Sequence, residues 1–240
     1  MNERMREGNA GGAEFFAMTS VTAAAHELKS PLVLMRQLAL SLDADMSTEE
    51  LQRAVWQLEL TSDRALRLID DVTQAQRLED GLFEVEPINP IALCEDVVRE
   101  LQPLYSAHQR HLRVRRRRNP PLVIANYSLL RRVISGFVDN ALHYAFDSEP
   151  VTIETQVVGS AVRICVRDRG PGVSSRLQRS LGAASPKLQS PTRRPLSSGL
   201  GLYIARQFAE AMQGRVGVVR HRDGASFYVE LNSSSQMSWL

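Results

Sequence analysis

A histidine followed directly by an acid stands near the start of the chain, in a stretch whose apolar spacing is typical of a helix. His26 follows the apolar position Ala25, so we expect it beside the apolar stripe of the helix and projecting toward solvent. An exposed imidazole can act as a nucleophile through one ring nitrogen when a base holds the other, and Glu27 is the candidate base. Pro31 cannot donate a hydrogen bond to the carbonyl of Glu27, which predicts a bend just below the histidine. An ordinary surface His–Glu pair remains the alternative interpretation of the dipeptide alone.

Three later segments carry groups that suit a metal and a ligand with phosphates. Asn140 lies within an amphipathic helix that is predicted over residues 128–145. An amide oxygen is a ligand that Mg²⁺ accepts together with phosphate oxygens. A satisfied polar residue is the alternative for this asparagine. Asp168 ends an apolar strand signal and is followed by Gly170 and Gly172, a pattern that allows a tight turn and close approach of the backbone to a ligand. A third segment, residues 199–201, places two glycines before a predicted helix, whose N-terminus can bind phosphate.

The string AAAHELKSPL around the histidine resembles the phosphoacceptor box of sensor histidine kinases, whose typical form is SHELRTPL. The resemblance implies that His26 is the phosphoacceptor and that Glu27 is its acid/base partner. Ser30 takes the place usually held by threonine or asparagine, the residue that in the family positions the water for dephosphorylation of the response regulator. The predicted catalytic residues are therefore His26, Glu27 and Ser30, and we expect weak phosphatase activity toward the partner.

The later segments resemble, in the same order, the nucleotide boxes of the GHKL ATP-binding superfamily. FVDNALHYA resembles the N box, in which the asparagine binds Mg²⁺, and DRGPG resembles the first glycine box, in which the aspartate accepts a hydrogen bond from the adenine amino group. SSGLGLYIARQFAEAMQG resembles the second glycine box. The resemblance implies ATP and Mg²⁺ as cofactors, with Asn140 as the metal ligand. The predicted nucleotide-binding residues are Asn140, His143, Tyr144, Asp168, Gly170, Gly172, Gly199, Leu200 and Gly201.

Three features depart from the family pattern. His143 stands where these kinases usually carry lysine or arginine, and residues 173–198 contain no aromatic residue where a phenylalanine-rich box is usual. Gly136 occupies the position at which the hydrolysing members of the superfamily carry a water-activating glutamate, so the predicted phosphoryl acceptor is His26 and not water. The departures leave open a second function, a nucleotide-binding signalling scaffold with weak or no kinase activity.

Two long helices are predicted for the part of the chain that contains the histidine, which lies in the first of them. Apolar residues recur at alternating steps of three and four over residues 21–42 and again over residues 51–72, which is a heptad pattern. Ser47 and Glu50 match the spacing of a capping box, so the second helix is predicted to begin near Ser47. We predict an antiparallel helical hairpin over residues 15–80, which pairs with a second copy into a dimeric four-helix bundle.

Short β-rich runs alternate with helical stretches from residue 81 onward. Asn89 and Pro90 predict the start of one helix, and Asn126 is the predicted cap of another. The strand signals fall at residues 82–86, 111–115, 122–125, 151–158, 162–168, 215–219 and 226–231. The predicted fold class is α+β, with the hairpin followed by an α/β-sandwich GHKL ATP-binding domain.

The proposed domain boundaries follow from these patterns. The catalytic ATP-binding domain is predicted over residues 81–232, and residues 174–198, rich in Ser, Pro and Arg, are predicted to form a lid. Residues 1–14 are predicted to be a flexible N-terminus and residues 233–240 a C-terminal tail.

The composition is that of an ordinary soluble globular protein: 240 residues, 43% hydrophobic and 23% charged, with a formal charge of +2. Cys94 and Cys165 are far apart and each lies in an apolar run, which favours buried reduced thiols over a disulfide or zinc site. No apolar stretch approaches the ~20 residues of a membrane helix, and the N-terminus lacks the apolar core of a signal peptide. We expect a cytoplasmic protein, or the cytoplasmic part of a longer membrane-bound sensor.

The expected partners follow from the resemblance. They are a second copy of the chain, the receiver domain of a response regulator, and a sensor domain that is either separate or missing from this chain. The basic run at residues 115–118 offers nucleic-acid binding as a third function, but it follows a strand signal and lacks interleaved aromatic residues, so a solvated loop is preferred. We predict no nucleic-acid partner and no membrane contact for this chain.

Overall fold

The computed structural model describes most of the chain as two compact units. The described residues are 25, 28–43, 46–79, 83–115, 120–144, 149–175, 178 and 200–234. One unit comprises Met1–Leu82 and Pro191–Gly201, and the other Phe83–Ser190 and Leu202–Leu240. None of the described helices is long and apolar enough to cross a membrane. The predicted N-terminal segment 1–14 and most of the predicted lid and C-terminal tail lie outside the described residues.

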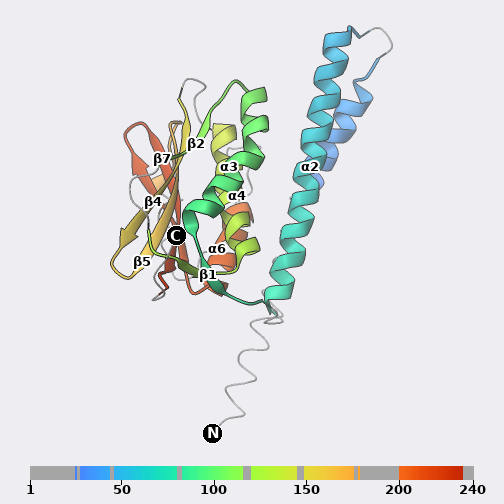
Figure 1. The fold of residues 1–240 in the computed structure, drawn as a ribbon. Helices are drawn as coiled ribbons and strands as arrows, with labels where there is room; N and C mark the ends of the chain where they lie inside the picture. The colour runs from blue at the N-terminus through green and yellow to red at the C-terminus, as the bar shows by residue number, and fades with distance from the viewer. Residues whose placement is uncertain are drawn as a thin grey trace. The chain divides into compact units, whose positions relative to one another are not determined.

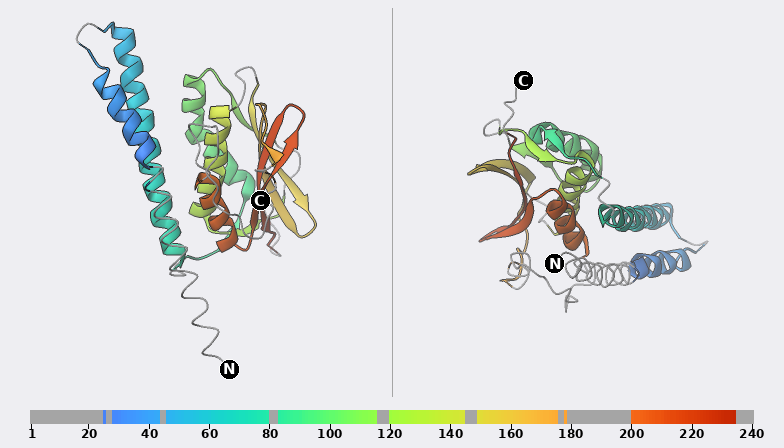
Figure 2. Two further views of the ribbon diagram at one scale, coloured as in Figure 1. Left: turned by 180° about the vertical axis from the view of Figure 1, so that it is seen from behind. Right: turned by 90° about the horizontal axis from the view of Figure 1, so that it is seen from below.

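Two helices make up the described part of the first unit. The chain is helical at residue 25 and over residues 28–40, and α2 spans Thr48–Glu79. These two helices lie side by side in Figures 1 and 2, where the first is blue. The predicted capping box is confirmed, because the backbone N–H of Glu50 donates to Ser47 Oγ (3.3 Å) and the backbone N–H of Ser47 donates to the Glu50 carboxylate (3.0 Å).

One hairpin buries only part of the predicted heptad seam. In α2, Ala54 and Ala65 are buried, and Leu58 is half-buried. Other apolar residues of the seam stay exposed within a single chain: Leu51 (44%), Val55 (51%) and Ile69 (47%). The hairpin therefore carries an apolar stripe that the described residues of its own chain leave uncovered.

In the described part of the second unit, helices α3, α4 and α6 cover one face of a sheet (Figures 1 and 2). Its elements, in chain order, are β1 (Glu86–Ile88), α3 (Pro90–Ala107), β2 (Leu112–Arg115), β3 (Val123–Ala125), α4 (Tyr127–Tyr144), β4 (Val151–Val158), β5 (Ala161–Asp168), α6 (Leu200–Ala211), β6 (Arg215–His221) and β7 (Gly224–Asn232). Five strands form the order β2-β4-β5-β7-β6, and β1 pairs separately with β3. Only β2 and β4 run parallel among these pairs. The predicted α+β class is confirmed.

Strand alternation decides which side chains meet the helices. Along β5, Val162, Ile164 and Val166 are buried, and successive side chains of a strand point to opposite faces. Phe137 of α4 packs on Phe227 of β7, with the ring centroids 5.9 Å apart. Asp168 has the same parity as the buried β5 residues, so the alternation directs its side chain toward the helix-covered face.

The opposite face of the sheet carries a charged network. The Glu230 side chain lies between two guanidinium groups, with Arg163 Nη2 at 2.7 Å and Arg215 Nη2 at 2.6 Å from its carboxylate oxygens. Each arginine also donates from Nε, so the carboxylate accepts two hydrogen bonds from each side. Arg163 lies over the ring of Tyr228, 4.2 Å from its centroid. This network ties β5, β7 and β6 together.

Local signals place both helix starts correctly. Asn89 Oδ1 accepts the backbone N–H of Ile91 (3.0 Å), with Pro90 at the first position of α3. Asn126 Oδ1 accepts the backbone N–H of Leu129 (3.1 Å) at the start of α4. Both predicted caps are confirmed.

The first strand differs from its prediction. The run 82–86 predicts a strand, but β1 lies at Glu86–Ile88, where Pro87 is opposite Ile124 of β3. Ile88 is 7% exposed and joins the core, whereas Val85 is 46% exposed. Burial of Ile88 fixes the pairing, and Pro87 is tolerated because β1 has a single neighbour among the described strands.

The cysteines and the basic run are described in part. Cys94 and Cys165 are free and buried, as predicted, and burial raises their pKa values to about 12 and about 11. Arg115 of the basic run lies in β2 and pairs with Glu154 at 3.2 Å. Residues 116–119 lie outside the described residues.

Candidate nucleotide-binding site

A buried carboxylate ends β5. Asp168 is 5% exposed and lies opposite Ala225 of β7, whose backbone N–H donates to the carboxylate. Burial raises the pKa of the Asp168 carboxyl, and that hydrogen bond and the charge of Arg167 act in the opposite direction. Because a buried carboxylate is stabilised by donors, this position suits a ligand that offers an N–H group.

Ion pairs hold the turn that follows this carboxylate. Arg169 pairs with Glu149 at 2.9 Å and with Asp223 at 3.5 Å, and Arg167 pairs with Asp223 at 2.6 Å. Gly172 has a φ of +70°, a left-handed conformation that glycine adopts without strain. The ion pairs therefore hold the residues around the start of the turn to Glu149 and to Asp223. Glycine at position 172 lets the backbone reverse there without a side chain.

Gly224 lets the β6–β7 hairpin approach the carboxylate. Its φ is +141°, and a Cβ placed there would lie 2.2 Å from the backbone carbonyl oxygen of Asp168. Only glycine therefore allows β7 to present the Ala225 N–H to Asp168. The Asp-Gly pair at residues 223–224 indicates a hairpin turn. No local signal places that turn against Asp168, so Gly224 and Ala225 are absent from the predicted site.

Helix α4 supplies an amide at the border of its buried face. Asn140 and Gly136 are half-buried and four residues apart, so they lie on one side of the helix. A Cβ added at Gly136 would meet none of the described residues within 4 Å. An amide oxygen is a ligand that Mg²⁺ accepts, and Mg²⁺ takes most of its other ligands from water and phosphate oxygens. No group of three His, Cys, Asp or Glu that could hold a metal occurs among the described residues.

The other predicted nucleotide-binding residues are placed unevenly. Gly170 is buried in the turn after β5, and Gly201 stands in the first turn of α6, where an added Cβ would meet none of the described residues within 4 Å. His143 and Tyr144 lie in the last turn of α4 and Leu200 begins α6, but their side chains are outside the description. Gly199 lies outside the described residues. Asn140 and Asp168 are both described, and the elements that carry them, α4 and β5, pack against each other.

Of the three predicted catalytic residues, only Ser30 lies among the described residues, on the helix over residues 28–40. Ser30 is exposed there. His26 and Glu27 lie outside the described residues, between the helical position 25 and the helix over residues 28–40.

Comparison with known proteins places this site in a family. Residues 125–235 match the family described as histidine kinase-, DNA gyrase B-, and HSP90-like ATPase. The sensor protein GacS of Pseudomonas syringae pv. syringae is 28% identical over 228 residues, which cover 91% of this chain and 25% of GacS. The sensor protein QseC of Salmonella typhi is 33% identical over 195 residues, covering 78% of this chain and 41% of QseC. The chain belongs to the sensor histidine kinases.

A solved structure agrees with the fold of this sensor histidine kinase. The crystal structure of full-length ShkA in complex with AMPPNP has a TM-score of 0.61, with 21% sequence identity, over 93% of this chain and 47% of that chain. The predicted family and the GHKL-type sandwich are confirmed. The histidine kinase chain spans 25% of GacS and 41% of QseC.

Proposed function

We propose that this chain is the kinase core that phosphorylates His26 with ATP and passes the phosphoryl group to an aspartate on a response regulator. The observation that carries the proposal is the buried carboxylate of Asp168, which lies within the segment that matches the ATPase family. Its place before a glycine turn supports a hydrogen bond from the adenine amino group to this carboxylate. Guanine carries a carbonyl oxygen in the equivalent position and cannot donate such a bond, so the site would prefer adenine.

The proposed transfer moves the γ-phosphoryl group of ATP to His26 and then to the receiver aspartate. A ring nitrogen of His26 attacks the γ-phosphorus of ATP, an N–P bond forms, the bond from that phosphorus to the bridging oxygen breaks, and ADP leaves. Glu27 holds the N–H of the other ring nitrogen, so the attacking nitrogen keeps its lone pair. The phosphoryl group then passes to a carboxylate oxygen of the receiver aspartate as the N–P bond breaks. The roles of His26 and Glu27 rest on the sequence motif.

The N-box helix suits transfer to histidine better than hydrolysis. Mg²⁺, when bound, neutralises charge on the phosphates, and Asn140 is the residue that fits it as a ligand. Gly136 provides no carboxylate one turn before Asn140 to activate a water. Asp139 projects about 100° away from Asn140 around the helix. The described part of α4 therefore lacks a base aimed at the same side as the proposed metal ligand.

A nucleotide-binding signalling scaffold with weak or no kinase activity is the second candidate. The observations that favour it are His143 in place of a cationic side chain and the lack of aromatic residues over residues 173–198. A neutral imidazole contributes less positive charge toward phosphates than lysine or arginine. The scaffold predicts nucleotide binding without transfer to His26.

A second copy of the chain is the proposed partner of the hairpin, and the receiver domain is the proposed partner in phosphotransfer. The uncovered stripe of α2, with Val55 51% and Ile69 47% exposed, supports burial against another hairpin. Val55→Glu places a charge in that stripe and is expected to give monomers in light scattering. Arg53→Gln is the matched control, because Arg53 is two residues away on another side of α2 and has 73% exposure of its side chain. A wild-type monomer at micromolar concentration contradicts the dimer.

Incubation with γ-labelled ATP and Mg²⁺ tests the transfer. We expect acid-labile, base-stable label on the wild type and none on His26→Gln. Label that persists in His26→Gln contradicts the assignment of the acceptor, and ATP binding without any label supports the scaffold.

Calorimetric titration of ADP and GDP tests the base specificity. Asp168→Asn is expected to weaken ADP binding and to reduce the preference for ADP over GDP, because it replaces the acceptor with an amide. Asp96→Asn, on the outer side of α3, is the matched control and is expected to bind ADP as the wild type does. Equal affinities in Asp168→Asn and wild type place the base elsewhere.

A further inference from the structure

Two side chains from the end of α3 and the loop after it hold the carbonyls of α4. Tyr105 is fully buried, and its hydroxyl donates to the backbone carbonyl oxygen of Val138 at 2.8 Å. Arg110 donates from its guanidinium group to the backbone carbonyl oxygen of Leu142. Val138 and Leu142 lie two residues before and two residues after Asn140. The two hydrogen bonds therefore bracket the proposed magnesium ligand.

The chemistry of both contacts indicates more than general packing. A carbonyl oxygen has two lone pairs, so Val138 can accept Tyr105 in addition to its partner in the helix. The buried hydroxyl of Tyr105 needs such an acceptor, which phenylalanine at the same place would not. Leu142 lies in the last described turn of α4, and a cation is favourable near the C-terminal end of a helix.

The contacts also lie next to the candidate site. Burial raises the pKa of Tyr105 far above its ordinary range, and the carboxylates of Asp139 and Asp168 raise it further, while Arg110 lowers it. The hydroxyl of Tyr105 is therefore within electrostatic reach of the residue next to Asn140 and of the proposed adenine-binding carboxylate.

We propose that Tyr105 and Arg110 are positioning residues that fix Asn140 of α4 for Mg²⁺ binding. The inference rests on the proposed function, in which Asn140 is the metal ligand. Mg²⁺ demands near-ideal octahedral geometry with ligands at about 2.0–2.1 Å, so a small shift of the helix weakens the metal contact. A hydrogen bond from adenine tolerates a wider range of distances, about 2.7–3.2 Å, so recognition by Asp168 is less sensitive to the same shift.

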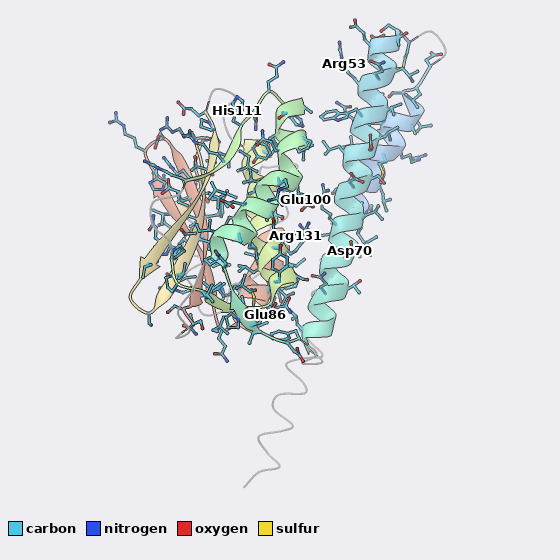
Figure 3. The ribbon with its side chains drawn as sticks, viewed as in Figure 1. Arg53, Asp70, Glu86, Glu100, His111 and Arg131 are labelled. Atoms are coloured by element: carbon cyan, nitrogen blue, oxygen red, sulfur yellow. The ribbon has the colours of Figure 1, made fainter. Side chains whose placement is uncertain are left out.

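The other contacts between α3 and α4 provide matched controls. The Tyr127 hydroxyl donates to Asp96 at 2.9 Å. Arg131 forms an ion pair with Glu100, and these two residues are labelled in Figure 3. These pairs also join α3 to α4, but they are exposed and belong to the first turns of α4, remote along the helix from Asn140. Loss of either pair removes a link between the helices without releasing the carbonyls beside Asn140.

Calorimetric titration of ADP into the full chain, with Mg²⁺ and separately with EDTA, tests the inference. The quantity of interest is the ratio of the Kd in EDTA to the Kd in Mg²⁺. We expect Tyr105→Phe and Arg110→Gln to lower this ratio by about fivefold, the effect of one lost hydrogen bond, with the Kd in EDTA within about twofold of wild type. Tyr127→Phe and Arg131→Gln are expected to keep the wild-type ratio. Arg110→Lys, which retains a cationic donor, is expected to recover part of the ratio.

The outcomes separate the inference from the function on which it rests. If Asn140→Ala loses the effect of Mg²⁺ while Tyr105→Phe and Arg110→Gln keep the wild-type ratio, the two bonds serve only stability and the inference is overturned. If Asn140→Ala itself keeps the ratio, the metal assignment fails, and the inference fails with it. Far-UV circular dichroism on each variant checks the fold. A proportional rise of both Kd values, with an unchanged ratio, also counts against a positioning role.

Discussion

Gly136 stands inside α4, and we expect alanine at this position to stabilise the ATP-binding domain. Glycine in a helix interior is less favourable than alanine by roughly 0.8–1.0 kcal/mol, because its backbone loses more freedom on folding. An added Cβ would meet no atom of the described part of the chain within 4 Å, so no clash with those residues offsets this gain. We therefore expect Gly136→Ala to raise the free energy of unfolding by about 0.8–1.0 kcal/mol, and the melting temperature by about 2–4 °C.

Urea denaturation followed by far-UV circular dichroism measures this effect, with a higher midpoint and an unchanged m-value expected. Gly217→Ala is the matched control on β6, where a Cβ would lie 2.4 Å from the Tyr228 ring, so the same change is expected to lower the midpoint. Binding of ADP with Mg²⁺ should be retained in Gly136→Ala. A lower midpoint for Gly136→Ala would refute the reasoning, because it requires a contact that the described residues do not make.

Three further changes test other parts of the structure. Burial alone raises the pKa of Glu230, but the hydrogen bonds from Arg163 and Arg215 more than offset it and hold that pKa below its ordinary value. The stability that ionised Glu230 contributes is present above its unfolded pKa of about 4.3 and is lost as pH falls through its lower folded pKa. The urea midpoints at pH 7 and pH 4 are therefore expected to differ less in Glu230→Gln than in wild type. Asn89→Ala removes the cap of α3 and is expected to lower the free energy of unfolding by about 1 kcal/mol, measured by the same denaturation. Ser30→Thr is expected to speed dephosphorylation of an independently phosphorylated response regulator while autophosphorylation stays the same, because the branched side chain holds its hydroxyl more rigidly. If the phosphorylated regulator already decays rapidly with wild type and the change leaves this rate unaltered, the prediction is wrong.

Features set by neighbouring residues were predictable from the sequence. The capping box of Ser47 and Glu50 and the cap at Asn89 involve partners within three residues, so their spacing alone identifies them. The strand that ends at Asp168 and the helix that carries Asn140 follow from periodicity in the same way. The order of these elements, together with the family resemblance, gave the fold class.

Features that depend on distant pairing were not predictable in this way. From the sequence alone, Tyr105 is one more apolar position of α3 and Arg110 is a solvated residue after a helix. Their hydrogen-bond acceptors, the backbone carbonyls of Val138 and Leu142, are 33 and 32 residues further along the chain. Gly224 reads as an ordinary turn residue until β7 is paired with β5. The predicted strand at residues 82–86 shifts to β1 for the same reason, since its partner β3 decides which residue is buried.

The two outer strands of the five-stranded sheet bear on how the protein behaves in concentrated solution. Among the described strands, β2 has only β4 as a neighbour and β6 only β7, so each leaves a row of backbone groups able to pair with another molecule. Arginines occupy both strands, Arg113 and Arg115 on β2 and Arg215 and Arg220 on β6. Arg115 and Arg215 are paired with Glu154 and Glu230, whereas Arg113 on β2 and Arg220 on β6 carry charge of the same sign, so edge-to-edge joining of sheets brings these like charges together and is disfavoured. These arginines thus act against aggregation, and replacing those of β2 with valine would create the kind of apolar edge that seeds it.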